Sequence, residues 1–428
     1  MTKEGRFSSF LNKTTLGGVV GNILEWYDFA VFGYFAPIIA KQFFPSDDPT
    51  AALINTFGVF AAGYLVRPLG GVVFGHIGDR LGRKHALQLS VLLMVIPSTL
   101  IGLLPTFEQV GILAPILLIL IRLIQGFSVG GELIGSISYM TEIAPPDKRG
   151  FLGSFAFMSA VGGVLLGSLV ATFMHLVFDD SFLSSWGWRI PFLFGFLVGI
   201  YGLWMRNGLP ETKAFEDIKE KGKIVANPVK EVLTKMPFKV IHLIGLIMIN
   251  AAGFYTIFVW WPTYITNIVE PPIGHALTVN TAAMLFFMIL IPIFGALSDK
   301  LGRRKLITTG IILFIILLYP MFLWTDQGIF SHAVIAQFSF TFVMAMAIGP
   351  ACATMIEMFP ATMRFSGIAL GYNIAQSLVG GTSPLICTWL ISRTGDIASP
   401  AYYLIIIAVI SLVAAILLDS KYGKQVKT

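Results

Sequence analysis

The segment GHIGDRLGRK at residues 75–84 returns as GALSDKLGRR at residues 295–304, so that its shared acidic residue recurs after 220 positions. A second segment, EIAPPDKR at 142–149, returns as EMFPATMR at 357–364 after a shift of 215 positions. Two nearly equal shifts indicate that the chain contains two copies of one structural unit. The fold is therefore expected to consist of two related halves with the same topology.

The composition around these segments is typical of a membrane protein. Of 428 residues, 56% are hydrophobic and 12% are charged, whereas soluble domains have about 25% charged residues. Apolar stretches of roughly 20 residues, which is the length that crosses a bilayer, recur along the whole chain. We expect twelve spanning helices, at about 17–40, 53–77, 86–104, 112–137, 153–178, 188–206, 238–265, 277–298, 306–324, 331–357, 365–391 and 400–418.

The basic residues indicate how these helices are oriented. With the amino terminus in the cytoplasm, 24 of the 29 Lys and Arg residues fall in cytoplasmic segments. This bias is the positive-inside rule, and it predicts that both termini are cytoplasmic. The net charge of +6 is then explained by topology, so that the expected partner is the lipid bilayer and not nucleic acid.

The longest polar stretch divides six predicted spans from six. We expect an amino-terminal six-helix bundle at 1–206, a cytoplasmic linker at 207–237 and a carboxyl-terminal six-helix bundle at 238–428. This is an all-α polytopic membrane protein whose two bundles are related by a pseudo-two-fold axis. Parallel repeats of this kind are typical of secondary transporters, in which one bundle rocks against the other around a site near the midplane.

The doubled pattern G-x-x-x-D-[RK]-x-G-R-[RK] resembles the signature of the major facilitator superfamily. Five further segments resemble its metabolite:proton symporter family: GNILEWYDF at 21–29, RPLGG at 67–71, QGFSVGGE at 125–132, WGWRIPF at 186–192 and LPET at 209–212. Members of that family carry proline and betaine, citrate, 2-oxoglutarate or shikimate. The resemblance implies a monomeric protein of the bacterial inner membrane that moves a small organic solute with protons and needs no cofactor.

Ionisable side chains inside the predicted spans are candidates for proton coupling. Each costs at least about 2.5 kcal/mol at the bilayer centre, so it must face protein or water. The first half holds five, and we expect its bundle to handle the proton: Glu25, Asp28, Arg67, Arg122 and Glu132. Glu25 and Asp28 are three residues apart and should be neighbours on one helix face.

Proton coupling is assigned to Glu25, Asp28, Arg67 and Glu132. Our hypothesis is that Glu132 or Asp28 carries the proton and that Arg67 is the partner it exchanges, because a carboxylate that loses its cation in an apolar site tends to become neutral. The alternative is a static network of ion pairs that orients the helices.

Solute binding is assigned first to Arg122, whose planar guanidinium matches a carboxylate in two contacts. The alternative is that Arg122 pairs permanently with an acid of the first bundle. The other predicted ligands are polar or aromatic and come from helices 1, 7 and 11: Asn22, Trp26, Tyr255, Asn373 and Gln376. Asn250, Trp260, Trp261 and Ser377 are weaker candidates.

The repeated loop motifs are expected to close the cytoplasmic side. The resemblance implies that Asp79 contacts the start of helix 11 and that Asp299 contacts the start of helix 5, where unpaired N–H groups favour an anion. It also implies two charge networks, one of Arg80, Arg83, Glu142 and Arg149, and one of Arg303, Arg304, Glu357 and Arg364. The alternative is that these charges only set the topology.

Other functions are disfavoured. The sequence offers no Walker A motif, no plausible nucleophile for an intramembrane enzyme, no output domain for a receptor and no histidines at metal-ligand spacing. A proton:drug antiporter is disfavoured because VGGVLLGS at 161–168 lacks the proline of the antiporter pattern. Asn22, Arg122 and the segment at 380–400 look closer to di- and tricarboxylate carriers than to proline/betaine carriers, so citrate or a similar acid is the first expectation and a proline/betaine-type osmolyte the alternative.

Overall fold

The computed structural model describes residues 13–80, 83–142, 144–207, 227–359 and 364–419. Every regular element within these ranges is a helix. Nine of the described helices are long and apolar enough to cross a membrane, and shorter apolar helices cover Leu93–Leu103 and Gly187–Tyr201. The predicted all-α membrane architecture is confirmed.

Helical segments cover all six predicted spans of the first half. They are α2 (Lys13–Tyr34) with α3 (Ala36–Phe43), α4 (Pro49–Leu65) with α5 (Arg67–Arg80), α6 (Arg83–Leu103), α8 (Leu113–Ser128) with α9 (Glu132–Glu142), α10 (Arg149–Val177), and η2 (Gly187–Arg189) with α12 (Ile190–Asn207).

The six spans of the second half follow in the same way. They are α15 (Pro237–Phe254) with η3 (Tyr255–Trp260) and α16 (Trp261–Asn267), α17 (Ala276–Leu301), α18 (Arg303–Thr325), α19 (Phe330–Ile348) with α20 (Ala351–Met358), α21 (Arg364–Ala375) with η4 (Gln376–Gly380) and α22 (Ser383–Thr394), and α23 (Ser399–Leu417).

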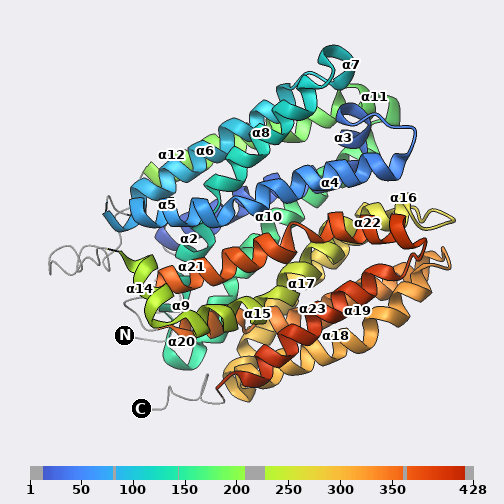
Figure 1. Cartoon of the computed structure of the whole chain (residues 1–428). Coiled ribbons are helices and arrows are strands. Elements are labelled where there is room, and N and C mark those ends of the chain that lie inside the picture. The colour runs from blue at the N-terminus through green and yellow to red at the C-terminus, as the bar shows by residue number, and fades with distance from the viewer. Residues whose placement is uncertain (1–12, 81–82, 143, 208–226, 360–363, 420–428) are drawn as a thin grey trace.

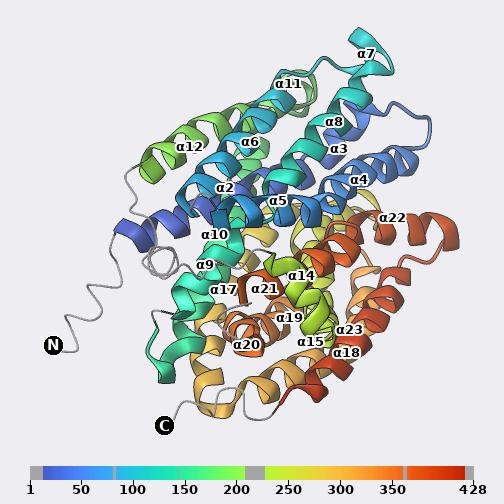
Figure 2. The ribbon, with the colours of Figure 1, turned by 60° about the vertical axis from the view of Figure 1, so that its left-hand side comes forward.

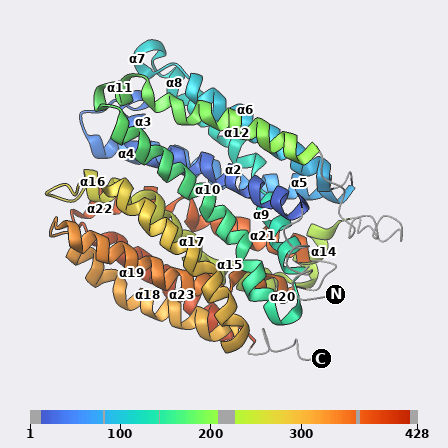
Figure 3. The same cartoon turned by 180° about the vertical axis from the view of Figure 1, so that it is seen from behind.

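The two halves form two bundles that lie side by side, with the first half above and the second half below in Figure 1. Two seams join them: α10 packs along α17, as Figure 3 shows, and α4 and α5 pack against α22 and α21. The start of α2 and the end of α23 lie on one side of the molecule, which we call the terminus side; the opposite side is the far side (Figure 1).

The predicted linker contains a helix. The segment α14 (Pro228–Lys235) begins with a proline at its first position, where no N–H is needed, and the Asn227 side chain accepts a hydrogen bond from the Lys230 N–H at 3.3 Å. α14 packs on α15 and α21 at the terminus side (Figure 2). It therefore covers that end of the second bundle.

Several spans are interrupted near their middle. α8 and α9 are separated by Val129, Gly130 and Gly131, and α19 and α20 by Gly349 and Pro350. η3 and η4 are π-helical turns, which are rare and occur frequently at functional sites. Such interruptions free backbone carbonyls that a continuous helix would use internally.

Candidate functional site

The two halves enclose a small cavity of about 30 Å³. This is room for only one or two water molecules, so a solute the size of an amino acid requires the bundles to move apart. The cavity walls are contributed by both halves: Trp26, Phe157, Ala160 and Val161 from the first, and Ile247, Asn250, Phe254, Ile348, Tyr372 and Gln376 from the second. The structure is thus a closed conformation.

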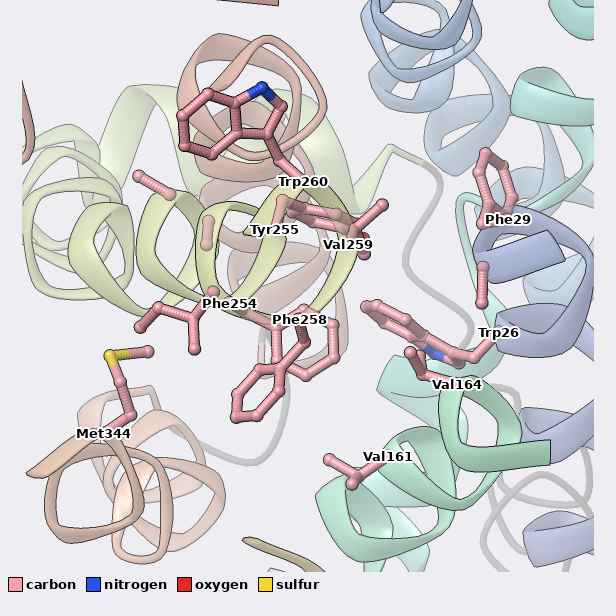
Figure 4. Close-up of a cluster of buried hydrophobic side chains, with 14 of the residues drawn as sticks. Trp26, Phe29, Val161, Val164, Phe254, Tyr255, Phe258, Val259, Trp260 and Met344 are labelled. Carbon is pink, nitrogen blue, oxygen red and sulfur yellow. The ribbon is translucent and has the colours of Figure 1, made fainter. Parts of the chain in front are cut away.

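Aromatic side chains dominate this interface, as Figure 4 shows for Trp26 and Phe29 of α2 facing Tyr255 and Val259 of η3. The Trp26 ring stacks on Tyr255 with 6.2 Å between ring centroids, and the Tyr64 hydroxyl donates to the Tyr255 hydroxyl at 2.8 Å. Tyr255 therefore lies at the contact of the bundles, as a predicted ligand should. Trp260 differs, because its indole N–H donates to Thr388 within the second half at 2.8 Å.

Polar atoms along the cavity are left without hydrogen-bond partners in the closed protein. The indole N–H of Trp26 and the Oδ1 atom of Asn250 are both buried and unpaired. Buried polar groups are nearly always paired, and leaving one unpaired costs about 1–3 kcal/mol. An unpaired donor and an unpaired acceptor beside one cavity are therefore the signature of a site for a polar ligand.

An ion pair lies beside this cavity. Nη2 of Arg67, at the start of α5, is 3.6 Å from Oε1 of Glu25 in α2, and both side chains are 2% exposed. The Arg67 guanidinium also lies over three aromatic rings, at 5.1 Å from Tyr64 and 5.9 Å from Trp26 and from Phe29. The predicted exchange partners of Arg67 were Asp28 and Glu132. The structure pairs Arg67 with Glu25, and the Glu132 side chain lies outside the described part of the chain.

Asp28 faces a different direction. Its carboxylate lies against Gly195 of α12 and accepts a hydrogen bond from the Ser98 hydroxyl of α6. Gln125 of α8 donates to Ser98 Oγ at 2.6 Å and accepts from Arg122 Nη1 at 2.8 Å. A continuous hydrogen-bonded chain therefore joins the Asp28 carboxyl to the Arg122 guanidinium inside the first bundle.

Glu25 and Asp28 are only about 60° apart around α2, yet their side chains have different partners. Glu25 pairs with Arg67 of α5, whereas Asp28 accepts from Ser98 of α6. The predicted role of Arg122 in lining the site is corrected by the structure. Arg122 is fully buried with its guanidinium over Phe29, Phe32 and Phe60. It is linked to an acid of its own bundle and does not line the cavity.

Two other predicted ligands are also engaged elsewhere. Asn22 donates to Ser159 of α10 at 3.1 Å, within the first half. Asn373 of α21 donates to the carbonyl of Gly130 at 2.7 Å, across the seam between the halves. The Gly130 carbonyl is free to accept because α8 ends just before it. Gln376, in contrast, lines the cavity, together with Tyr372 one turn earlier, and its assignment to solute binding stays a prediction.

On the terminus side, Asp299 at the end of α17 contacts the start of α10. Its carboxylate accepts hydrogen bonds from the backbone N–H groups of Gly150 at 2.8 Å and Phe151 at 2.9 Å. This is the contact that the sequence predicts for Asp299. A Cβ atom on Gly150 would lie 2.4 Å from the Gly295 carbonyl oxygen, so only glycine allows the two helices to approach this closely.

Arg303 completes this contact. It is 1% exposed and binds Asp299 Oδ1 at 2.8 Å, and it forms a two-pronged pair with Glu357 at 2.9 and 3.3 Å. Arg364 donates to the carbonyls of Ile356 and Phe359 at 3.0 and 3.3 Å. Arg149 and Arg304 are half-buried.

The corresponding contact of the first repeat involves side chains that lie outside the described part of the chain. They are Asp79, Arg80, Arg83 and Glu142. The Glu132 side chain also lies outside it, and these assignments stay predictions.

The far side is closed by a polar network that sequence reasoning did not find. The Tyr34 hydroxyl of α2 donates to the Phe258 carbonyl of η3 at 2.8 Å. Asn280 of α17 donates to Tyr34 Oη at 3.0 Å and accepts from Gln337 of α19 at 2.6 Å. Buried amides in apolar spans are a usable sequence signal for such a network, since each needs a partner.

Two models of known protein families match this chain, one over each half. The family model described as "Sugar (and other) transporter" matches residues 14–239, and the model described as "Major Facilitator Superfamily" matches residues 246–426. Among solved structures, the proton:xylose symporter XylE superposes with a TM-score of 0.75 at 20% identity, covering 97% of both chains. At this identity the likeness concerns the fold.

Curated relatives are similar over nearly the whole chain. The proline/betaine transporter of Salmonella typhimurium is 33% identical over 426 residues, which is 97% of this chain and 85% of the relative. A glycine betaine/proline/ectoine/pipecolic acid transporter of Dickeya dadantii, OusA, is 32% identical with the same coverage. A putative proline/betaine transporter of Staphylococcus aureus is 34% identical, covering 97% of this chain and 90% of the relative.

Proposed function

Because the chain belongs to the metabolite:proton symporter family of the major facilitator superfamily, we propose that it takes up a small zwitterionic solute of the proline and betaine type together with protons. The family consists of transporters and not enzymes, its proton symporters use the proton as coupling ion, and they need no cofactor. The protein is a multi-pass protein of the inner membrane. We propose that its terminus side is cytoplasmic and that it works as a monomer.

The observation that carries the solute class is the charge balance of the central site. Among the described residues that line the cavity, none is charged. The nearby Arg67 is paired with Glu25, and Arg122 is enclosed in the first bundle. A citrate trianion would therefore find no net positive charge, and burying it without one is very costly.

A zwitterion fits the same surroundings without net charge. Its carboxylate can accept from donors such as the Trp26 indole N–H, and its positive nitrogen is attracted by aromatic faces such as those of Trp26 and Tyr255. The substrates printed for the curated relatives, proline and betaine, are zwitterions of this size. Both arguments favour the proline/betaine alternative over citrate.

For proton coupling, the structure supports Asp28 in preference to Arg67 or Glu25. Its chain through Ser98 and Gln125 to Arg122 joins α2, α6 and α8. A buried charge is stable only when it is paired, so an ionised Asp28 attracts Arg122, whereas a protonated Asp28 does not. Loading and releasing a proton at Asp28 would thus change how these three helices pack, and that change would couple the proton to the rocking of the bundles.

Uptake into proteoliposomes tests this proposal. Purified protein is reconstituted, an inward proton gradient is imposed, and labelled proline, glycine betaine and citrate are supplied in parallel. We expect accumulation of proline or glycine betaine that a protonophore abolishes, and no accumulation of citrate. Accumulation of citrate, or zwitterion uptake that ignores the gradient, would contradict the proposal.

A further inference from the structure

The ion pair of Glu25 and Arg67 lies apart from the proton chain and beside the cavity. The Trp26 side chain connects the ion pair to the cavity: its ring centroid is 5.9 Å from Arg67 Cζ, and the same side chain lines the cavity. Arg67 is also linked to the second bundle through Tyr64 of α4: its guanidinium lies 5.1 Å from the Tyr64 ring, and the Tyr64 hydroxyl donates to Tyr255 of η3. The pair therefore lies at the contact between the halves, where a transported solute must pass.

The geometry of the pair leaves binding capacity on the arginine. The separation of 3.6 Å between Arg67 Nη2 and Glu25 Oε1 is longer than a charged hydrogen bond, which measures about 2.7–2.9 Å. The Nε atom of Arg67 is buried without a hydrogen-bond partner. A guanidinium offers five donors in a planar fork that matches a carboxylate in two contacts, and the closed protein does not use this fork fully.

The pair also has the charge pattern of a zwitterion placed head to tail. A carboxylate and a guanidinium stand side by side with no net charge, so a solute with one positive nitrogen and one carboxylate can lie against them in the opposite direction. Each charge of the solute then meets an opposite charge of the protein. An anion or a cation alone would satisfy one protein charge and leave the other buried and repelled.

We infer that Glu25 and Arg67 are the recognition pair for the zwitterion: Arg67 binds the carboxylate of the solute, and Glu25 attracts its positive nitrogen. The rings of Trp26 and Tyr255 cover the same nitrogen and its neighbouring carbon atoms. This inference rests on the proposed function. It assigns Glu25 and Arg67 to solute binding and leaves the proton to Asp28, so the two functions use separate charges of α2.

The test is equilibrium binding to the full-length protein in detergent, with no proton gradient. The ligands are L-proline, glycine betaine and two proline analogues: tetrahydrofuran-2-carboxylate, which lacks the positive nitrogen, and L-prolinamide, which lacks the carboxylate. We expect the wild type to bind proline at least about tenfold more tightly than either analogue, since each lost charge-assisted contact has about this effect.

The informative variant is the double substitution Glu25→Gln/Arg67→Gln. It removes both charges and leaves hydrogen-bonding side chains, whereas a single substitution leaves one buried charge alone and risks misfolding. We expect proline binding to weaken about tenfold or more and the preference for proline over the two analogues to disappear. The matched control is Glu231→Gln/Lys235→Gln, which makes the same change in an exposed ion pair of α14 and should leave binding unchanged.

The outcomes separate this inference from the proposed function. If the wild type binds proline and the folded double variant binds it equally well with the same preference, the recognition pair is refuted and the proposed function stands. If the wild type binds neither proline nor glycine betaine, the proposed function fails and the recognition pair fails with it.

Discussion

Individual residues of α2 are predicted to have separable roles, and Asp28 gives the clearest case. Asparagine at position 28 can still accept from Ser98 and resembles the protonated carboxyl group, so the fold should be kept. We expect Asp28→Asn to abolish proton-driven accumulation of solute, because no proton is carried. Exchange of labelled for unlabelled solute across a vesicle without a gradient should remain within about threefold of wild type.

The matched control for this variant is Asp326→Asn, at an exposed carboxyl group beyond the end of α18. It should transport like the wild type. Accumulation by the Asp28→Asn protein at the wild-type rate would remove Asp28 from the coupling mechanism. If the Asp28→Asn protein loses both exchange and accumulation, Asp28 also serves in solute binding or folding.

The sequence predicts which residues of α2 matter but not how they divide. Glu25 and Asp28 are ionisable and lie inside a span, so they are recognisable as candidates from composition alone. Their partners depend on where α5, α6 and α12 stand around α2, and a helix-face argument within α2 contains no such information. The partner of Asn373 was unpredictable for a similar reason: the Gly130 carbonyl is available as its acceptor because α8 is interrupted nearby in space.

Pairs of helices within the first bundle approach so closely that glycine is required at particular positions. A Cβ atom on Gly126 of α8 would lie 1.6 Å from the Gly63 carbonyl oxygen of α4. We expect Gly126→Ala to force these helices apart and to lower the unfolding free energy by about 1–3 kcal/mol, the usual cost of overpacking. The measurement is the apparent melting temperature of the purified protein in detergent.

Gly58 of α4 provides the matched control for this substitution. A Cβ atom there would meet no atom within 4 Å, and alanine favours the helix over glycine. Gly58→Ala should therefore keep or slightly raise the melting temperature. Equal melting temperatures for the two variants would contradict the close contact of α4 with α8.

At the scale of the helices, the sequence predicted the structure best. Hydropathy located the helices, because a bilayer requires apolar helices of fixed length: each predicted span is helical in the described part of the chain, and nine of these helices are long and apolar enough to cross a membrane. The family resemblance of the repeated motif implied a contact of Asp299 with the start of α10, and the structure has this contact. The interruptions at η3 and η4 were not predicted, since a π-helical turn changes the hydrogen-bonding register of the backbone without an unambiguous signal in the side chains.

At the scale of the whole molecule, the structure is closed on both sides of the cavity. Asp299 and Arg303 hold α17 against α10 on the terminus side, and Asn280 and Tyr34 hold α17 against α2 on the far side. One set must break for the site to open to either compartment. The balance between outward and inward states should therefore depend on the relative strength of these two sets of contacts.

Weakening the terminus-side contacts and weakening the far-side contacts should shift this balance in opposite directions. Asp299→Asn removes a charge from two backbone hydrogen bonds and from the Arg303 pair, so we expect the terminus side to open more often. Asn280→Ala removes the link between Tyr34 and Gln337 and should open the far side. The charged hydrogen bonds of Asp299 contribute about 1.5–3 kcal/mol, and loss of the neutral Asn280 contacts leaves buried groups unpaired at a cost of about 1–3 kcal/mol. These values correspond to roughly fivefold or more in population.

Thiol labelling on both sides measures these populations. A cysteine introduced as Ser154→Cys reports on the contact of α10 with α17 at the terminus side, and one introduced as Val259→Cys reports on the contact of η3 with α2 at the far side. Their labelling is measured above the background of the buried native residues Cys352 and Cys387. Asp299→Asn should speed labelling only at position 154, and Asn280→Ala only at position 259. Because the two sets lie far apart, their effects should add, and the double variant should label faster at both positions. Labelling that rises at the same position in both single variants would show that α17 does not close the two sides independently.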